Sequence, residues 1–310
     1  MGWWRGSVVS SLAAVLACAC ATAPSPLVAR AVPSEVTAPV EVQGHRGARA
    51  ARPENTLAAF AHAIEAGADV LEMDLAVTAD DRLAVVHDLQ VNPERCLGPD
   101  GRPDSRRPAV RSLSLADLKR YDCGTLPHPA FPAQVAVPGQ AIPSFEEVVA
   151  LVKVSSFLAA PAVRLNVELK TVPGRPDLGP PAERLAALAA DAIRASGLQD
   201  RITVQCFDHA VLRALHARLP SLSLSALLDQ DRPADLAGVA REARAGTLSP
   251  HHEWITPADV RVLHGAGLRV VPWTANDPAA WERLLRMGVD GIITDDPAGL
   301  VAWLKAQGAR

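Results

Sequence analysis

Short apolar segments alternate with helical segments from about residue 40 to residue 305, and this alternation restricts the fold more than any other feature. Consecutive parallel strands are joined by crossover helices, which produces such an alternation. Eight strands of this kind favour a closed TIM-type (β/α)8 barrel of the α/β class over an open sheet. The predicted strands are Val40–Gly44, Val70–Ala76, Val163–Leu169, Ile202–Cys206, Ser221–Leu227, Ala245–Leu248, Leu268–Trp273 and Gly291–Thr294.

The segments between the strands have the apolar periodicity of helices. The clearest are Ala182–Ser196, His209–Leu219, Thr256–Ala266, Pro278–Met287 and Pro297–Gln307. Residue types that commonly cap helix N-termini precede such segments at Asp208, Thr256, Asn276 and Asp296. The strands appear short and apolar throughout, so we expect both of their faces to be buried.

Residues 1–31 are expected to be a targeting segment rather than part of the fold. Charged and aromatic residues precede an apolar run, Val8–Ala21, and a stretch rich in Pro, Ser and Ala follows it. This order is typical of a secretory signal peptide, and the run is shorter than the roughly 20 residues of a membrane-spanning helix. The alternative is a buried N-terminal helix. The predicted single folded domain covers residues 38–308.

Two processing routes remain open for an exported protein of this kind. The sequence Val15-Leu16-Ala17-Cys18 resembles a bacterial lipoprotein site, in which a lipid on Cys18 would tether the protein to the membrane. Ordinary cleavage after Ala31 would instead release a soluble protein. Both routes predict a periplasmic location, either free or as a membrane-anchored lipoprotein.

A long irregular segment, residues 89–143, interrupts the alternation after the second strand region. It is rich in Pro and Gly and contains one helical run, Ser114–Tyr121. A loop of this length inside a compact domain is usually functional, so we place this insertion over the barrel mouth. In an oxidising compartment, Cys96 and Cys123 could pair and cross-link loops that lack a core, whereas the alternative is two free thiols.

The charge distribution limits the kinds of partner. The formal net charge is −3, and Lys and Arg are scattered rather than clustered. Binding to nucleic acid normally needs a basic surface, so we expect no nucleic acid partner. We also predict no obligate protein partner.

Three acidic residues occupy strand positions that otherwise belong to an apolar core. Glu72 and Asp74 are two residues apart, so their side chains share one face of a strand, and Glu168 repeats the pattern in a later strand. Buried carboxylates are costly unless they are paired or bind a metal. Three oxygen ligands suit one hard divalent cation, Mg²⁺ or Ca²⁺, better than zinc. The alternative is an ion-paired barrel rim with Arg46 and Lys170.

Two histidines follow different strands, at ends that we expect to face the same side of the barrel. His45 follows the first strand, and His87, with Asp88 after it, follows a short additional strand. Phosphodiester cleavage needs one group that accepts a proton and one that donates a proton, and histidine does both near neutral pH. Arg46 and Lys170 add positive charge for a phosphate. The alternative for each histidine is a structural role.

Taken in order, these segments resemble the signature of the glycerophosphodiester phosphodiesterase family. The N-terminal part contains His45-Arg46-Gly47, Pro53-Glu54-Asn55-Thr56, Gly67-Ala68-Asp69-Val70-Leu71-Glu72-Met73-Asp74 and His87-Asp88. The later part contains Asn166-Val167-Glu168-Leu169-Lys170, Gln205-Cys206-Phe207-Asp208, Pro272-Trp273-Thr274-Ala275-Asn276 and Gly288-Val289-Asp290-Gly291-Ile292-Ile293-Thr294-Asp295. The resemblance covers nearly the whole predicted domain.

The resemblance implies a barrel enzyme that hydrolyses glycerophosphodiesters, its small-molecule substrates, to an alcohol and sn-glycerol 3-phosphate. The first nucleophile would be either water or the substrate's own glycerol hydroxyl. Trp273 would lie on the glycerol side of the pocket. The residues implied are Glu72, Asp74 and Glu168 for one divalent metal, His45 and His87 for acid/base catalysis, and Arg46, Lys170, Trp273 and Phe207 for phosphate or substrate binding.

Two features depart from the family pattern. Cys206 stands where the family usually has Ser, and we expect it to behave as a small apolar residue in a strand. The insertion at residues 89–143 is longer than in compact members of the family. Because this insertion shapes the mouth, the sequence does not decide which head group the substrate carries.

Two other functions are compatible with parts of this pattern. A non-catalytic ligand-binding surface lipoprotein would have lost a histidine or a metal carboxylate, and all five are present. A phospholipase D-like or sphingomyelinase D-like enzyme would act on intact lipid through an apolar rim, for which the candidates are Leu126, Pro127, Pro129, Phe131 and Pro132.

His251 and His252, after the sixth strand, either reach the mouth or lie in a solvated loop.

Overall fold

The computed structural model describes residues 39–158 and 163–310. The predicted targeting segment, residues 1–31 with Cys18, lies outside these ranges, so export, lipidation and location stay predictions. In the part of the chain that is described, none of the helices combines the length and the apolar character needed to cross a membrane.

Eight parallel strands form a barrel, as predicted. They are β1 (Glu41–Gly44), β2 (Val70–Val77), β4 (Arg164–Leu169), β5 (Ile202–Cys206), β6 (Ser223–Leu228), β7 (Thr247–Pro250), β8 (Arg269–Val270) and β9 (Gly291–Thr294). Their order in the sheet is β8-β7-β6-β5-β4-β2-β1-β9. Backbone hydrogen bonds from Asp290 N to Val270 O, 2.9 Å, and from Ile293 N to Pro272 O, 3.0 Å, bring the two end strands together. The sheet therefore closes into the expected barrel.

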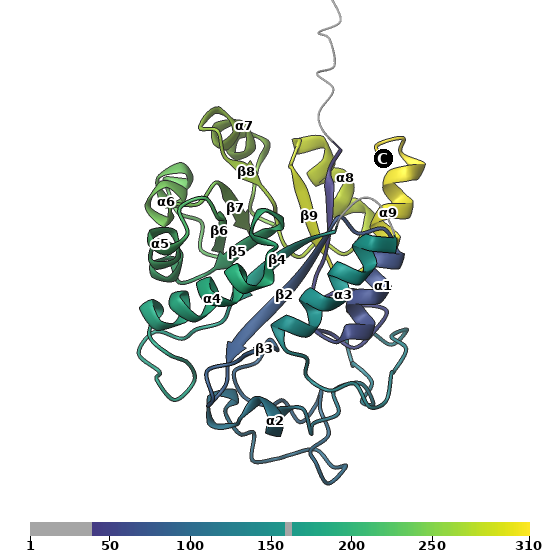
Figure 1. The fold of residues 1–310 in the computed structure, drawn as a ribbon. Helices are drawn as coiled ribbons and strands as arrows, with labels where there is room; N and C mark the ends of the chain where they lie inside the picture. The colour runs from purple at the N-terminus through teal and green to yellow at the C-terminus, as the bar shows by residue number, and fades with distance from the viewer. Residues whose placement is uncertain (1–38, 159–162) are drawn as a thin grey trace, which may run out of the picture. The chain divides into compact units, whose positions relative to one another are not determined.

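Helices surround the strands (Figure 1). They are α1 (Leu57–Glu65), α3 (Phe145–Leu158), α4 (Ala182–Ser196), α5 (His209–Arg218), α6 (Leu236–Ala243), α7 (Pro257–Gly265), α8 (Pro278–Met287) and α9 (Pro297–Ala306). The predicted bounds of α4 and α8 are confirmed, and those of α5, α7 and α9 differ by at most one residue at each end. The helices α3 and α6 were not among the segments predicted.

Three of the four predicted N-caps are confirmed. The side chains of Asp208, Thr256 and Asp296 each accept a backbone N–H from the first turn of the helix that follows. The prediction for Asn276 was wrong, because Asp277 caps α8 by accepting the N–H groups of the first turn. Asp277 immediately precedes the first helical residue, where a capping side chain can reach those N–H groups. Asn276 is thereby free for another contact.

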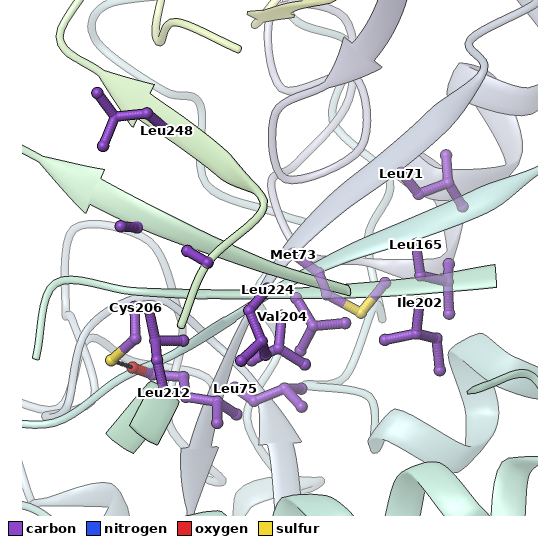
Figure 2. Close-up of a cluster of buried hydrophobic side chains, with 14 of the residues drawn as sticks. Leu71, Met73, Leu75, Leu165, Ile202, Val204, Cys206, Leu212, Leu224 and Leu248 are labelled. Carbon is purple, nitrogen blue, oxygen red and sulfur yellow. Dashed lines mark hydrogen bonds between the residues drawn. The ribbon is translucent and has the colours of Figure 1, made fainter. Parts of the chain in front are cut away.

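Both faces of the strands are buried, as expected, but the strands are not apolar throughout, because polar residues occupy one face. In β2, Leu71, Met73 and Leu75 belong to the main core, and Glu72 and Asp74 alternate with them. Figure 2 shows these three side chains in the same cluster as Val204 of β5 and Leu212 of α5. Side chains of a strand alternate between its two faces, so the acidic residues lie on the face opposite this core. The inward-facing polar residues include Gln43, Asn166, Gln205, Ser225 and Ser249, all buried.

Cys206 packs in the main core, as expected of a small apolar residue. Its thiol is buried and donates a hydrogen bond to Leu169 O at 3.1 Å, drawn as the dashed line in Figure 2. Burial raises the pKa of this thiol well above its usual value. A serine hydroxyl at this position could donate the same bond, which explains why the departure from the family pattern is mild.

A short antiparallel strand, β3 (Leu83–Val85), returns the chain toward the barrel mouth. It pairs with the C-terminal part of β2, with Val85 opposite Leu75. The next residue, Val86, donates its N–H to Asp74 O at 3.0 Å. The additional strand predicted before His87 is therefore a hairpin partner of β2 and not a strand of the barrel. This hairpin carries His87 back to the level of the acidic residues.

The insertion lies at the end of the barrel toward which the β2 arrow points in Figure 1, as predicted. The expectation that its loops lack a core was wrong. Val91, Val110 and Leu118 form a second buried apolar cluster with Ala76 and Ala84 of the β2–β3 hairpin. The helical run predicted within the insertion is shorter than expected and forms α2 (Leu115–Leu118). Apolar burial therefore stabilises this segment.

A disulfide joins Cys96 to Cys123 across the insertion, which resolves the pairing in favour of the oxidised alternative. Both residues belong to or pack against the second cluster. The bridge therefore fixes the insertion to its own core.

We expect reduction of this disulfide to destabilise the protein. The bridge has a sequence separation of 27 residues. Loop-closure entropy for such a loop corresponds to about 3.5 kcal/mol of unfolding free energy. Denaturant unfolding with and without reductant measures the difference, and a Cys96→Ser, Cys123→Ser double variant serves as the control that reductant should not affect. Equal unfolding midpoints for the parent protein in both conditions would contradict the prediction.

Candidate active site

The turn after β1 brings His45 and Arg46 to the mouth, and its shape requires two glycines. A Cβ on Gly44 would lie 2.2 Å from Gly47 O, and a Cβ on Gly47 would lie 2.7 Å from the backbone carbon of Ala59. Gly47 also has a φ of +87°, in the left-handed region that glycine adopts readily. Arg46 has a φ of 51°, which is uncommon for a residue with a side chain. In this conformation its N–H donates to Glu72 Oε2 at 2.9 Å.

Three carboxylates meet at the inner face of the barrel. Glu72 and Asp74 are each 1% exposed, and Glu168 is 8% exposed. Asp74 lies directly opposite Glu168 in the register between β2 and β4. One carboxylate oxygen from each residue lies within 4.8 Å of the other two. The structure therefore brings together the three residues expected to hold a metal.

Two cations lie beside these carboxylates. Arg46 Nε is 3.3 Å from Asp74 Oδ2, while Lys170 Nζ is 2.6 Å from Glu168 Oε1 and 3.3 Å from Asp74 Oδ1. Burial alone would raise the pKa of Asp74, but the charges of Lys170 and Arg46 hold it well below its usual value. The ion pairs of the alternative interpretation are thus present for two of the three carboxylates.

Glu72 lacks such an ion pair with Arg46 or Lys170. Its oxygens accept hydrogen bonds from Gln205 Nε2 at 3.0 Å and from the backbone N–H of Arg46, and His45 Nε2 lies 4.0 Å away. Burial and the charges of Asp74 and Glu168 raise the pKa of Glu72 well above its usual value. Glu72 is therefore the carboxylate of the three whose charge is least compensated by neighbouring cations.

The donor set fits a hard divalent cation. All three side chains offer oxygen, the ligand atom that Mg²⁺ and Ca²⁺ prefer. Asp74 Oδ1 is buried and receives no hydrogen bond from any described residue, although Lys170 Nζ is near it. A cation shared by the three carboxylates would satisfy this atom and relieve the repulsion that raises the pKa of Glu72. The residues present could hold such an ion.

Amide side chains hold the acidic residues in place. Asn55 Nδ2 donates to Asp74 Oδ2 at 2.9 Å. Asn166 Nδ2 donates to Gln43 Oε1 at 2.9 Å and to Gln205 Oε1 at 3.0 Å, which leaves the Gln205 amide N–H to donate to Glu72. A chain of hydrogen bonds across the barrel interior thereby fixes the orientation of Glu72.

His45 is oriented by an aspartate from the far end of the chain. Its Nδ1 lies 2.6 Å from Oδ1 of Asp295, the residue after β9. Asn276 holds that aspartate, because its Nδ2 donates to Asp295 Oδ2 at 2.7 Å and its Oδ1 accepts the Asp295 N–H at 2.8 Å. Burial and the charge of Arg46 lower the pKa of His45, although Asp295 acts in the opposite direction. With Nδ1 bound to the carboxylate, Nε2 is left for chemistry.

His87 has the same kind of partner. Its Nδ1 lies 2.7 Å from Oδ1 of Asp88, and Asp88 Oδ2 accepts from Asn92 Nδ2 at 2.8 Å. His87 and Asp88 are both partly exposed at the mouth. Two histidines, each with Nδ1 on an aspartate, therefore approach the acidic cluster from different segments of the chain.

A cavity of about 250 Å³ collects these residues. The rings of Phe207 and Trp273 form one wall in an edge-to-face contact at 5.6 Å. All predicted site residues except Asp74 line the cavity, and Asp74 belongs to the acidic cluster below it. A second cavity of about 420 Å³ shares part of this lining and extends under the insertion, with Gln90 and Arg107 on its wall.

The histidines after β7 support the aromatic wall. The His251 ring packs against Trp273 with centroids 5.4 Å apart, and His252 Nδ1 lies 3.0 Å from Arg283 Nη2. Neither histidine is part of the lining of the two cavities.

Sequence reasoning did not assign the residues that orient the site. Asp295, Asp88, Gln205 and Asn55 all lie inside the segments that resemble the family signature, but their partners were not identified. Their positions were the available signal: Asp295 and Asp88 follow strands, Gln205 lies near the end of β5, and Asn55 is in the loop after β1. The carboxyl ends of barrel strands are where functional side chains gather.

Comparison with known proteins agrees with this geometry. Residues 45–299 match the model of the glycerophosphoryl diester phosphodiesterase family. A glycerophosphodiester phosphodiesterase of Caldanaerobacter subterraneus is 31% identical over 271 residues, which cover 86% of this chain and 98% of that protein.

Solved structures share the fold. A crystal structure from Silicibacter pomeroyi, of a protein assigned to the same family, has a TM-score of 0.80 at 28% identity, covering 87% of this chain and 94% of that one. An Oleispira antarctica phosphodiesterase, solved with the product sn-glycerol-3-phosphate, has a TM-score of 0.71 at 21% identity, covering 86% and 97%. The family match over most of the chain is decisive: this protein belongs to the glycerophosphoryl diester phosphodiesterase family.

Proposed function

We propose that this protein hydrolyses glycerophosphodiesters to an alcohol and sn-glycerol 3-phosphate, with the help of one divalent cation, Mg²⁺ or Ca²⁺. The observation that carries the proposal is the placement of His45 and His87 on one cavity above three clustered carboxylates. Membership of the family supports the reaction class. The product bound to the Oleispira antarctica protein supports glycerol 3-phosphate as the part of the substrate that the site recognises.

Glu72, Asp74 and Glu168 would hold the cation. When bound, such an ion polarises a phosphoryl oxygen and offsets the negative charge that develops during cleavage. Arg46 and Lys170 line the same cavity and add positive charge at its floor. Positive groups that are already in place where charge develops contribute strongly to catalysis, because they need no rearrangement.

The two histidines would divide the proton transfers. One would accept a proton from the nucleophile through Nε2, and the other would protonate the leaving oxygen through Nε2. Asp295 and Asp88 each occupy Nδ1, so both rings present the same nitrogen to the cavity side. This arrangement supports either order of the two roles, and it serves water or a glycerol hydroxyl as nucleophile equally well.

The second cavity offers room for the alcohol part of the substrate. It shares His87, Glu168, Lys170 and Phe207 with the first cavity, so a diester could extend from one into the other.

An enzyme that acts on intact lipid is the second candidate, and the structure argues against it. Phe131, the largest member of the apolar rim it would need, is partly buried: its ring makes a tilted contact with His128, with centroids 4.6 Å apart, and lies under the guanidinium of Arg49 at 5.0 Å. These contacts restrict its entry into a lipid surface.

The activity assay measures release of glycerol 3-phosphate from glycerophosphocholine by the purified protein. We expect no release in EDTA and recovery when Mg²⁺ or Ca²⁺ is restored. Release of choline, with formation of phosphatidate, from intact phosphatidylcholine in place of cleavage of the water-soluble diester would favour the lipid enzyme. A folded protein that binds the cation but cleaves neither substrate would favour the ligand-binding alternative.

We expect His45→Ala and His87→Ala each to lower kcat by about 10²- to 10⁴-fold, the usual contribution of a positioned acid or base. Circular dichroism should show a folded protein in both cases. His216→Ala, on α5 and outside the cavity, is the matched control and should retain parental kcat. Near-parental activity in either site variant would remove that histidine from the mechanism.

Glu168→Gln should weaken cation binding, because it removes one of three charged ligands. Affinity for Ca²⁺ or Mg²⁺ by titration calorimetry is expected to fall about 10-fold or more, since ligand charge largely sets the affinity of such sites. Asp177→Asn removes an exposed carboxylate that pairs with Arg175 and should leave the affinity unchanged. Equal affinities in the parent and in Glu168→Gln would show that Glu168 is not a ligand.

A further inference from the structure

The insertion contacts the loop that carries Arg46 through a short stretch, residues 126–135, which we name the roof segment. Gln134 Nε2 donates to Arg49 O at 2.6 Å and to Arg52 O at 3.1 Å. The Val135 N–H donates to Ala51 O at 3.0 Å. The roof segment is therefore hydrogen-bonded to the loop between His45 and Thr56.

His128 of the roof segment is 5% exposed and lies against two charged side chains of that loop. Its Nδ1 accepts the Ala130 N–H at 3.1 Å, which assigns the proton of the neutral ring to Nε2 and leaves no acceptor there for Arg49. That Nε2 is 3.6 Å from Glu54 Oε2 and 3.2 Å from Arg49 Nη2. Arg49 Nη2 is itself 3.1 Å from Glu54 Oε2, so an N–H group of Arg49 and, just beyond hydrogen-bond distance, Nε2 of His128 face one carboxylate oxygen.

Glu54 in turn connects the roof segment to the reaction centre. Its Oε1 accepts from Arg46 Nη1 at 2.8 Å, and Arg46 also approaches Asp74 of the acidic cluster. Arg49 Nε lies 3.7 Å from Asp295 Oδ1, the oxygen that also meets His45. The contacts of His128 therefore lead to the phosphate-binding arginine and to the partner of one histidine.

Several buried polar atoms of this network lack hydrogen-bond partners within the described part of the chain. Glu54 Oε2, Arg49 Nε and Arg46 Nε are buried and make no hydrogen bond of good geometry with any described residue. Charged groups in such a setting depend on the position of each neighbour, because an unpaired buried polar group is costly. Removal of one member is expected to shift the others.

We infer that His128 is a positioning residue for the reaction: it holds Glu54 in the orientation that aims Arg46 at the phosphate. The inference rests on the proposed diester hydrolysis. It assigns to the insertion a part in the chemistry, beyond its part in shaping the mouth.

The test compares His128→Ala, His128→Gln and His128→Asn. A Gln amide can place an N–H near the position of Nε2, whereas the shorter Asn amide corresponds to Nδ1. We expect kcat/KM of His128→Ala to fall about 10- to 100-fold, the usual effect of losing a group that orients a functional side chain. His128→Gln should recover most of this loss, and His128→Asn should not. Equal losses in the Gln and Asn variants would overturn the inference, even if the Ala variant fails to fold.

A double-mutant cycle separates positioning from general destabilisation. If His128 acts through Glu54, the variant with both His128→Ala and Glu54→Gln should be no slower than Glu54→Gln alone. Additive losses in the double variant would overturn the inference. Val135→Ala changes an exposed side chain of the same segment and is the matched control, with parental kinetics expected.

Binding of inorganic phosphate gives a readout that does not depend on turnover. Titration calorimetry should show about 10-fold weaker phosphate binding in His128→Ala than in the parent, with His128→Gln close to the parent. Unchanged phosphate affinity in His128→Ala would overturn the inference. If the parent protein cleaves no diester but His128→Ala still binds phosphate about 10-fold more weakly than the parent, the proposed reaction is refuted and the role of His128 stands.

Discussion

The alternation of side chains along β2 places two carboxylates inside the barrel, and the rest of the site depends on that placement. Leu71, Met73 and Leu75 pack into the main core, which leaves Glu72 and Asp74 no alternative but the inner face. A one-residue shift of β2 would turn the apolar set into the polar barrel interior and bury the acids among the helices. The hydrophobic core therefore determines the register, and the register determines where negative charge accumulates.

Burial of that charge explains why the barrel interior is polar. An aliphatic filling, common in barrels of this type, would leave the carboxylates without hydrogen bonds. Here Gln43, Asn166 and Gln205 form a hydrogen-bonded chain beneath Glu72, and Asn55 supports Asp74 from the side. These amides orient the acids without adding charge, so the attraction for a cation is retained.

The sequence predicted the barrel, most helix bounds and most residues that line the cavity at His45 and His87, because each depends on local periodicity or on a short motif. Apart from the Cys96–Cys123 pairing and the grouping of the three carboxylates, it did not predict contacts between residues distant along the chain. Asn276 was expected to cap α8, yet its side chain holds Asp295, and only the closed barrel brings the two together. The second apolar cluster was missed for a related reason, since Val91, Val110 and Leu118 are spread over an irregular segment and share no period.

The separate core of the insertion has an evolutionary consequence. Most of its buried side chains come from the insertion itself and from the small residues Ala76 and Ala84 of the hairpin. Substitutions on its outer loops can therefore accumulate with little effect on the stability of the barrel. Among related proteins, the residues that line the larger cavity can therefore diverge while the acidic cluster is retained. Selectivity for the alcohol that leaves during hydrolysis can then change faster than the hydrolysis reaction itself.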